Sequence, residues 1–507
     1  MGWDSPQPAQ HPEVVTAEGR VRGRWRPTTG ASLSGEPLSG TPLSAAFLGI
    51  PFAEPPVGEL RFAAPVPKAP WDGVLDAAGF GATPQRGDPG VTLIPEPSVP
   101  GASTLNVNVF TPLPRQQVPG LPVMVWIHGG GYSAGSPASP WYDGRNFNRD
   151  GVVTVTISYR LGFDGFGWIE GAPSNRGVRD WLLALEWVQR NIAAFGGDPG
   201  RVTIAGQSAG GGAVTTLLGM EAAQHLFHGA YCMSGAVNAL PAARAQSLGR
   251  SLAERAEVSP TRAGWSAVTE ERVLELQEAE TSINLRTLKS MRTGGLPLGP
   301  TVDGDLIPRS PLASLRQGVG GDKPFVVGSA DDEFTMMPDR AAKILRWVPR
   351  SGVLRLAGLT GDSRTAYLAD NADVAALGKV RLAGRVLTDA CFRANVLRML
   401  HARGPGPTWA YRFSWPSANN GVAGHCIDVP FFFDCLDGPA VEPIAGPYPP
   451  QQLADELHCA AVSFVTKGEP GWSRYDEPGS PVQIFDASSA IRPDGYASVR
   501  AMLTPRA

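Results

Sequence analysis

The stretch Arg201–Leu218, RVTIAGQSAGGGAVTTLL, decides how this sequence folds. The apolar run Val202–Ala205 predicts a buried strand, and Gln207–Leu218 predicts a helix. Between them stands GQSAG at 206–210. A sharp turn from strand to helix strains the residue at the turn, and glycine neighbours relieve the clash. The pattern therefore predicts an exposed nucleophile at Ser208, against the alternative of a glycine-rich turn with an incidental serine.

Apolar runs that predict strands alternate with periodic runs that predict helices on both sides of this stretch. The segment PVMVWI at 122–127 is continuously apolar, which is typical of a strand buried on both faces. This alternation predicts an α/β fold, with a mostly parallel central sheet flanked by helices. The predicted strands are Leu105–Phe110, Pro122–Ile127, Val152–Tyr159, Val202–Ala205, Pro324–Gly328 and Thr408–Phe413, and the predicted helices are Asp180–Ile192, Gln207–Leu218 and Gln451–Lys467.

The length of the chain and the helical segments of its second half bear on domain organisation. At 507 residues the chain exceeds the size at which one compact core usually stops growing. No clear linker divides it, so we expect a single catalytic domain over residues 1–507. Segments of helical character at about 240–300 and 341–402 interrupt the series of strands. Helices inserted between core strands predict a cap or lid over the active site.

Composition and charge argue against several classes of protein. The 44 Lys and Arg residues nearly balance 47 Asp and Glu residues, without a long basic run, so we expect no nucleic-acid partner. The five cysteines lack C-x-x-C spacing, which predicts reduced thiols, no metal and no cofactor. No segment approaches ~18 uninterrupted apolar residues, so no membrane span is expected. The N-terminal residues lack the basic-then-apolar run of a secretory signal, which favours the cytoplasm.

A second glycine-rich motif, HGGG at 128–131, directly follows the predicted strand Pro122–Ile127. Glycine amides at a strand end can point at the oxyanion that forms during attack on a carbonyl, together with the N–H of Ala209. A phosphate-binding loop is the alternative, but the motif lacks the G-K-[ST] ending of such loops. We therefore expect an oxyanion hole here, with His128 as a structural residue.

The general base must come from the seven histidines of the chain, and the order serine, acid, histidine restricts the choice. Only His401, His425 and His458 follow the strand that can carry the acid. His458 lies inside a predicted helix and His401 lies near a helix end, whereas His425 lies in a loop that can present an imidazole. We expect His425 to be the base, against the alternative of a structural histidine.

Three consecutive carboxylates are candidates for the acid that orients this histidine. Asp331, Asp332 and Glu333 follow the predicted strand Pro324–Gly328 in the sequence SADDE at 329–333. Spacing alone does not choose among them. The two that are not the acid are expected to be ordinary solvated loop charges.

Six segments along the chain carry motifs of one family. They are FLGIPFAEPPVGELRF at 47–62, LNVNVFTP at 105–112, VMVWIHGGGY at 123–132, SYRLGFDGF at 158–166, NIAAFGGDPGRVTIAGQSAGG at 191–211 and GHCIDVPFFF at 424–433. In these segments the chain resembles the type-B carboxylesterases, which include bacterial p-nitrobenzyl esterases and the cholinesterases. The resemblance runs nearly end to end. It implies the α/β-hydrolase fold and a serine esterase.

Carried over position by position, the resemblance assigns roles that spacing left open. The implied catalytic residues are Ser208 as nucleophile, Glu333 as acid and His425 as base, and the implied oxyanion donors are Gly130, Gly131 and Ala209. Ser234 and Asp428 resemble positions that support the histidine from behind, against the alternative of ordinary polar residues.

The sequence departs from this family at three places. Gln207 stands where the family often has Glu, which removes a charge beside the nucleophile but leaves the turn sterically intact. Ala-Ser-Thr at 102–104 replaces the usual Glu-Asp-Cys, so the N-terminal disulfide of the family is not expected. Phe334 replaces the common Gly after the acid, and we expect it to reshape the loop that holds Glu333.

These residues predict ester hydrolysis through an acyl-enzyme on Ser208. We expect a small-molecule ester as substrate; the oligomeric state does not follow from the sequence. One alternative is an amidase or carbamate hydrolase with the same triad, and another is a non-catalytic, cholinesterase-like binding protein. Aromatic residues that could line an apolar substrate pocket, or belong to the core instead, are Trp141, Tyr142, Phe163 and Phe431–Phe433.

Overall fold

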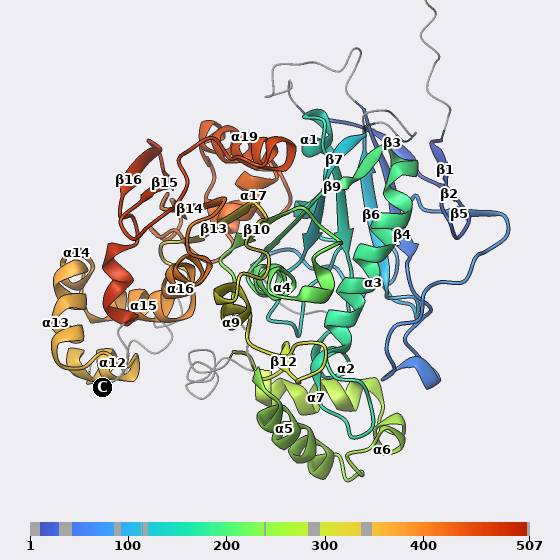
Figure 1. Ribbon diagram of the computed structural model, residues 1–507, viewed down its shortest axis with the longest axis horizontal. Coiled ribbons are helices and arrows are strands. Elements are labelled where there is room, and N and C mark those ends of the chain that lie inside the picture. The colour runs from blue at the N-terminus through green and yellow to red at the C-terminus, as the bar shows by residue number, and fades with distance from the viewer. Residues whose placement is uncertain are drawn as a thin grey trace, which may run out of the picture.

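An eleven-stranded sheet organises the molecule (Figure 1). The structure is a computed structural model, and it describes residues 11–29, 43–85, 93–112, 114, 120–237, 240–281, 295–335 and 347–503. The strands follow the order β16-β15-β14-β13-β10-β9-β7-β8-β6-β4-β3 across the sheet. Their bounds are β3 (Arg24–Pro27), β4 (Leu43–Pro51), β6 (Asn106–Thr111), β7 (Leu121–Ile127), β8 (Val153–Ile157), β9 (Gly197–Gln207), β10 (Gly229–Met233), β13 (Phe325–Ala330), β14 (Thr408–Phe413), β15 (Pro481–Phe485) and β16 (Ala490–Pro493).

The centre of this sheet is parallel. All neighbours from β15 to β8 pair in parallel, and the outer strands pair antiparallel. The mostly parallel central sheet predicted from the sequence is therefore confirmed. Because β7 lies between β8 and β9, the chain changes direction across the sheet at β7, and such switch points place ligand sites at the carboxyl ends of the strands. Ile127 at the end of β7 pairs with Gly206 of β9, which brings the HGGG loop beside Ser208.

Side chains of the central strands alternate between two buried clusters, one on each face of the sheet. In β7, Val125 and Ile127 belong to one cluster, and Met124 and Trp126 belong to the other. Helices contribute to both clusters, as predicted for a sheet covered on both faces. The first contains residues of α3 (Arg176–Asn191), α4 (Ala209–Leu218) and α16 (Ala394–Arg403), and the second contains residues of α1 (Arg145–Arg149), α17 (Asp428–Phe432) and α19 (Gln451–Lys467).

Two further groups of helices lie apart from the sheet, at the lower end and at the left of Figure 1. The first group is α5 (Ala242–Arg255), α6 (Arg262–Ser266) and α7 (Glu270–Thr281). The second is α12 (Arg350–Leu356), α13 (Gly361–Asp370), α14 (Ala372–Ala376) and α15 (Lys379–Thr388), followed by the π-helical turn η5 (Asp389–Arg393). The expected helical character at about 240–300 and 341–402 is present in the described parts of both, whereas 282–294 and 341–346 lie outside the described residues.

The remaining elements are short. The strands β1 (Glu13–Val15), β2 (Arg20–Arg22) and β5 (Val74–Asp76) form a separate small sheet, and β11 (Leu240–Pro241) pairs with β12 (Thr301–Val302). The short helices are α2 (Gly162–Phe166), α9 (Pro311–Arg316) and α18 (Glu442–Ala445), and the 3-10 turns are η1 (Gly58–Leu60), η2 (Pro140–Tyr142), η3 (Ile192–Phe195), η4 (Glu221–Ala223) and η6 (Ala497–Met502). In the part of the chain that the structure describes, no helix has the length and apolar character to cross a membrane.

The elements predicted from sequence agree with the structure except at a few ends. β14 and α19 have the predicted bounds, while β9 is longer than the predicted strand Val202–Ala205. The predicted helix start at Gln207 is wrong, because β9 continues through Gln207 and α4 begins at Ala209. Ser208 is the single residue between β9 and α4, so the chain turns from strand to helix within one residue.

Candidate active site

Ser208 occupies a strained turn between β9 and α4. Its backbone has φ 59° and ψ −120°, a conformation that residues with side chains rarely adopt. The Ser208 N–H donates to the carbonyl of Met233 at 2.9 Å, which fixes the turn against β10. A Cβ on Gly206 would lie 2.6 Å from the carbonyl oxygen of Gly210. The glycine at 206 is therefore required by the close approach of strand and helix.

His425 lies between Ser208 and Glu333. Its Nε2 is 2.9 Å from Ser208 Oγ, and its Nδ1 is 2.5 Å from Glu333 Oε2. The backbone joins the same pair, since the His425 N–H donates to the Glu333 carbonyl at 3.1 Å. The His425 side chain is 9% exposed and that of Glu333 is fully buried. The structure thus brings together the serine, acid and histidine that the resemblance singled out.

The Glu333 carboxylate has hydrogen-bond partners on both oxygens. Oε2 faces His425, while Oε1 accepts from Ser234 Oγ at 2.5 Å and from the Ala330 N–H at 2.9 Å. Ser234 follows β10 directly and holds φ 49°. Because a buried carboxylate without donors is unfavourable, these contacts also fix the direction in which Glu333 points. Ser234 therefore touches the acid and not the histidine ring.

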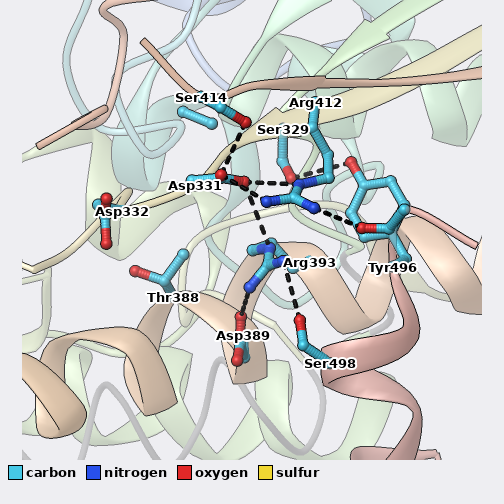
Figure 2. A network of polar contacts seen from close by, with 12 residues as sticks. Ser329, Asp331, Asp332, Thr388, Asp389, Arg393, Arg412, Ser414, Tyr496 and Ser498 are labelled. Carbon is cyan, nitrogen blue, oxygen red and sulfur yellow. Dashed lines mark hydrogen bonds and ion pairs between the residues drawn. The ribbon is translucent and has the colours of Figure 1, made fainter. Parts of the chain in front are cut away.

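The other two carboxylates of this loop pair with arginines. Figure 2 shows Asp331 beside Arg412, with 2.6 Å between Oδ2 and a guanidinium nitrogen. Asp332 Oδ1 lies 3.1 Å from Arg385. Burial alone would raise the pKa of Asp331, but the guanidinium groups of Arg412 and Arg393 hold it well below its ordinary value. Asp331 is therefore ionised and paired, which differs from the solvated loop charge expected from the sequence.

Asp428 lies behind the histidine without touching it. The carboxyl is fully buried at the start of α17, and Oδ2 accepts from the Tyr411 hydroxyl at 3.2 Å. Within the described residues Oδ1 has no partner. Burial, aided by the negative charge of Glu333, raises the pKa of Asp428 to about 7. Near neutral pH this carboxyl is partly protonated, which limits repulsion between it and Glu333.

The protonation of His425 reflects competing influences. Burial lowers its pKa, whereas interactions with Cys426 and Glu333 raise it, and the net direction is upward from 6.5. Burial also raises the pKa of the Cys426 thiol, so this group is neutral near pH 7. We therefore assign the upward shift to Glu333. The carboxylate stabilises the imidazolium, which is the form that a histidine base takes after it accepts a proton.

The HGGG loop after β7 presents free amides next to Ser208. Gly130 and Gly131 have φ 100° and 62°, and neither N–H has an acceptor among the described residues. A Cβ on Gly129 would lie 2.9 Å from the Gln207 carbonyl, so the loop packs directly against the turn. Ala209 is the first residue of α4, and the first amides of a helix have no partner within it. The three amides can therefore receive an anion.

His128 is part of the framework of this loop. Its Nδ1 lies 2.9 Å from the Gly129 carbonyl oxygen, and its ring stacks on Tyr159 at 4.5 Å between centroids. Burial lowers the pKa of His128 to about 4. The ring is thus neutral and enclosed, in agreement with the structural role expected from the sequence.

Most of the aromatic residues considered for a pocket belong to the core. Trp141, Tyr142 and Phe431–Phe433 pack in the same buried cluster as Trp126. Phe163 packs against Trp265 with centroids 4.2 Å apart. These side chains have almost no exposed surface, so the core alternative describes them.

Two other aromatic rings contact the histidine, and one of them had no signal in the sequence. Phe334, noted only as a departure from the family, lies 5.3 Å from the His425 ring. Phe392 lies 5.0 Å from it and is 2% exposed. Phe392 follows no motif and lies in a helical segment, so only the folded structure connects it with His425.

A metal is not suggested by the donor groups of the described chain. In those ranges no group of three or more His, Cys, Asp or Glu side chains could hold an ion. The five cysteines are free thiols, and four of them are buried.

A serine at a strained turn after a parallel strand, with a histidine and a carboxylate from the ends of later strands beside it, is the arrangement found in α/β-hydrolases. A family model described as "Carboxylesterase family" matches residues 10–483. The chain therefore belongs to the carboxylesterase family, and it is a carboxylic ester hydrolase.

Individual relatives agree with this assignment. The para-nitrobenzyl esterase of Bacillus subtilis (strain 168) is 32% identical over 486 residues, which cover 90% of this chain and 94% of the relative. The fumonisin B1 esterase of Sphingopyxis macrogoltabida is 31% identical over 458 residues, covering 85% of this chain and 82% of the relative. A solved carboxylesterase of Geobacillus stearothermophilus superposes with a TM-score of 0.80 at 29% identity, covering 97% of this chain and all of that one.

Proposed function

We propose that Ser208, His425 and Glu333 form the catalytic triad of this esterase. The observation that carries the proposal is the continuous series of contacts from Ser208 Oγ to His425 at 2.9 Å and from His425 to Glu333 at 2.5 Å. A serine hydroxyl is a weak nucleophile unless an adjacent base accepts its proton. His425 Nε2 is placed to do so, and Glu333 orients the ring and stabilises its charged form.

Hydrolysis then proceeds in two stages. Ser208 Oγ forms a bond to the ester carbonyl carbon while its proton passes to His425 Nε2. When the bond to the alkoxy oxygen breaks, His425 returns this proton to the leaving alcohol, and the acyl group remains on Ser208. A water molecule then attacks the acyl carbon and gives its proton to His425. As the bond between the acyl carbon and Ser208 Oγ breaks, His425 returns this proton to Oγ, and the acid product leaves.

The negative charge on the carbonyl oxygen needs donors that are in place before attack. The amides of Gly130, Gly131 and Ala209 supply them in this proposal, because the HGGG loop packs against the Ser208 turn, Ala209 follows Ser208 directly, and the glycine amides have no acceptor among the described residues. Ser234 supports the acid through Oε1 of Glu333, and Asp428 lies behind the pair as a partly protonated carboxyl. The site needs no cofactor for this chemistry.

The substrate proposed for this site is a small-molecule carboxylic ester. In this proposal the helical insertions at about 240–300 and 341–402 form a cap over the active site, within one catalytic domain. Contacts to α2 support this, since Gln277 of α7 accepts from the Phe163 N–H at 2.9 Å. We also propose a cytoplasmic location, because the structure pairs none of the five cysteines in a disulfide.

Turnover of p-nitrophenyl butyrate by purified protein tests the assignment. Ser208→Ala is expected to fold like the wild type and to lose at least about 10⁴-fold in kcat, because only the activated hydroxyl forms the acyl-enzyme. Ser463→Ala, which removes an exposed hydroxyl bonded to the Glu469 carbonyl, is the matched control and keeps wild-type turnover. Retained activity in Ser208→Ala contradicts the proposal. An aryl carbamate measured in parallel shows whether the same serine prefers carbamates.

A further inference from the structure

The loop that carries Glu333 is bound to one helical segment on both sides of the acid. Asp331 faces Arg393, with 3.8 Å between Oδ1 and Nε, and Asp332 pairs with Arg385 at 3.1 Å. On the other side, the Phe334 N–H donates to Thr388 Oγ1 at 3.0 Å. Glu333 alone turns away from this segment toward His425.

These three partners lie in α15 and in the π-helical turn η5 that follows it. Helix and loop are in close contact, since a Cβ on Gly384 would lie 2.6 Å from Thr335 Cα. A π-helical turn inserts an extra residue into an α-helix, changes the direction of the following side chains, and is often found at functional sites. Here the turn directs Asp389, Phe392 and Arg393 into the interior, where each is at most 2% exposed.

Buried charges fix the turn in place (Figure 2). Arg393 contacts Asp389 at 2.7 Å and Ser498 Oγ at 3.1 Å, in addition to Asp331. Asp331 is in turn held by Arg412 at 2.6 Å and by Ser414 Oγ at 2.7 Å. A buried ion network of this kind contributes little net stability compared with apolar packing, but it tolerates few alternative arrangements. It therefore defines one position for the turn relative to the acid loop.

The residue that this turn places against the imidazole is Phe392. Its ring centroid is 5.0 Å from that of His425, with 36° between the planes. Phe334 closes a cluster of three rings, 5.3 Å from His425 and 4.9 Å from Phe392. Packed rings restrict rotation of the imidazole and keep water from one of its faces. A ring face also attracts the positive charge that develops on the histidine during attack.

We propose that α15 and η5 are a positioning device for the reacting histidine, in which Phe392 fixes the His425 ring and Thr388, Arg385 and Arg393 fix the loop on either side of Glu333. The inference rests on the proposed triad and adds residues outside it: Phe392 contacts His425, and the other three contact the residues that flank Glu333. Because a misplacement of about 1 Å can cost roughly 10²-fold in rate, loosening this segment should lower kcat and leave substrate binding unchanged.

The test compares Phe392→Leu with Phe485→Leu. Both remove a phenyl ring that is 2% exposed, but Phe485 packs on Tyr411 and Trp472. With p-nitrophenyl butyrate, Phe392→Leu is expected to lose roughly tenfold in kcat with KM within about twofold, and the rate of Ser208 labelling by an organophosphate should fall in parallel. Phe485→Leu should keep wild-type kcat. Equal losses of kcat in both variants overturn the proposal.

Thr388→Val keeps the proposal testable if Phe392→Leu does not fold. This near-isosteric change removes only the hydroxyl that receives the Phe334 N–H. It should lower kcat several-fold with unchanged KM, and wild-type kcat in this variant overturns the positioning role. Failure of the triad is recognised separately, because Ser208→Ala would then remain active. If Ser208→Ala is inactive while Phe392→Leu has full kcat, the triad stands and only the positioning device is refuted.

Discussion

Among the described residues, two histidines face a carboxylate, and the difference between them bears on which one is suited to act as a base. His425 lies beside Glu333 and has the Ser208 hydroxyl at its other nitrogen. His458, in α19, lies 3.2 Å from Asp150, and its other nitrogen is 2.8 Å from the Phe432 carbonyl oxygen. A hydroxyl can donate to a neutral imidazole, whereas a carbonyl only accepts.

The two histidines also differ in their burial and in the residues around them. The His458 side chain is fully buried, packs at 4.5 Å against the Phe147 ring, and joins a charge network through Asp150 and Arg149. The Phe432 carbonyl and the Asp150 carboxylate are both acceptors, so neither offers His458 a proton as the Ser208 hydroxyl does for His425. The His425 side chain, in contrast, is 9% exposed, next to Ser208. The group that faces the second ring nitrogen therefore distinguishes His425, the proposed base, from His458.

The largest expected effect separates the two histidines directly. His425→Ala should lower kcat for p-nitrophenyl butyrate by about 10⁴-fold or more, because it removes the imidazole nitrogen that lies 2.9 Å from the Ser208 hydroxyl. His458→Ala should keep kcat within a small factor in the fraction that folds. Steady-state kinetics on protein quantified by circular dichroism makes the measurement. Comparable losses of kcat in both variants would break the comparison.

The next effect concerns the acid. Glu333→Gln should lose about 10³–10⁴-fold in kcat with little change in KM, since an amide does not stabilise the imidazolium. Asp331→Asn should lose far less, because Asp331 faces Arg412 and not the histidine. An active Glu333→Gln beside an inactive Asp331→Asn would show that the wrong carboxylate has been assigned.

How much of this site follows from sequence depends on the residue. Ser208 and the HGGG loop lie in contiguous motifs, where a few neighbours define the local backbone. Glu333 was chosen among three adjacent carboxylates only by resemblance, since the arginines that turn the other two away are distant in sequence. Phe392 could not be predicted, because a π-helical turn changes the register that helical periodicity assumes.

A third effect appears in stability. His458→Ala leaves Asp150 with Arg149 but without the imidazole, and removing one hydrogen-bond partner of a buried carboxylate costs about 1–3 kcal/mol in free energy of unfolding. Burial raises the pKa of Asp150, but the contacts with His458 and Arg149 lower it by more, so the net shift of this pKa is downward. Its contribution to stability is therefore present above the unfolded-state pKa and lost as pH falls.

Urea denaturation at pH 7 and acid titration followed by fluorescence measure these changes. His458→Ala should unfold at lower urea concentration and at higher pH than the wild type. If the stability of His458→Ala equals that of the wild type, His458 does not have the structural role that the comparison with His425 assigns to it.

A smaller effect concerns pH dependence. Because the pKa of His425 is raised above 6.5, the neutral base appears only as pH rises through that higher value. The acid limb of kcat/KM should therefore have its midpoint above 6.5. In Glu333→Gln the residual activity should have a lower midpoint, because the carboxylate that raises this pKa is gone. A midpoint that does not move would assign the upward shift to another group.

The smallest expected effect is that of metal removal. Dialysis against EDTA should change neither kcat nor the unfolding midpoint, since the described residues contain no group of ligands for an ion. Full recovery of a lost activity by a divalent cation would contradict this expectation.

Covalent labelling with a fluorescent organophosphonate, followed by peptide mass spectrometry, tests the central claim most directly. The reagent reacts only with a serine activated by a neighbouring base, so it reports the contact between Ser208 and His425 without a choice of substrate. The account predicts one adduct, on the peptide that contains Ser208, lost in Ser208→Ala and His425→Ala and retained in His458→Ala. An adduct on another serine, or labelling that depends on His458 and not on His425, would contradict it.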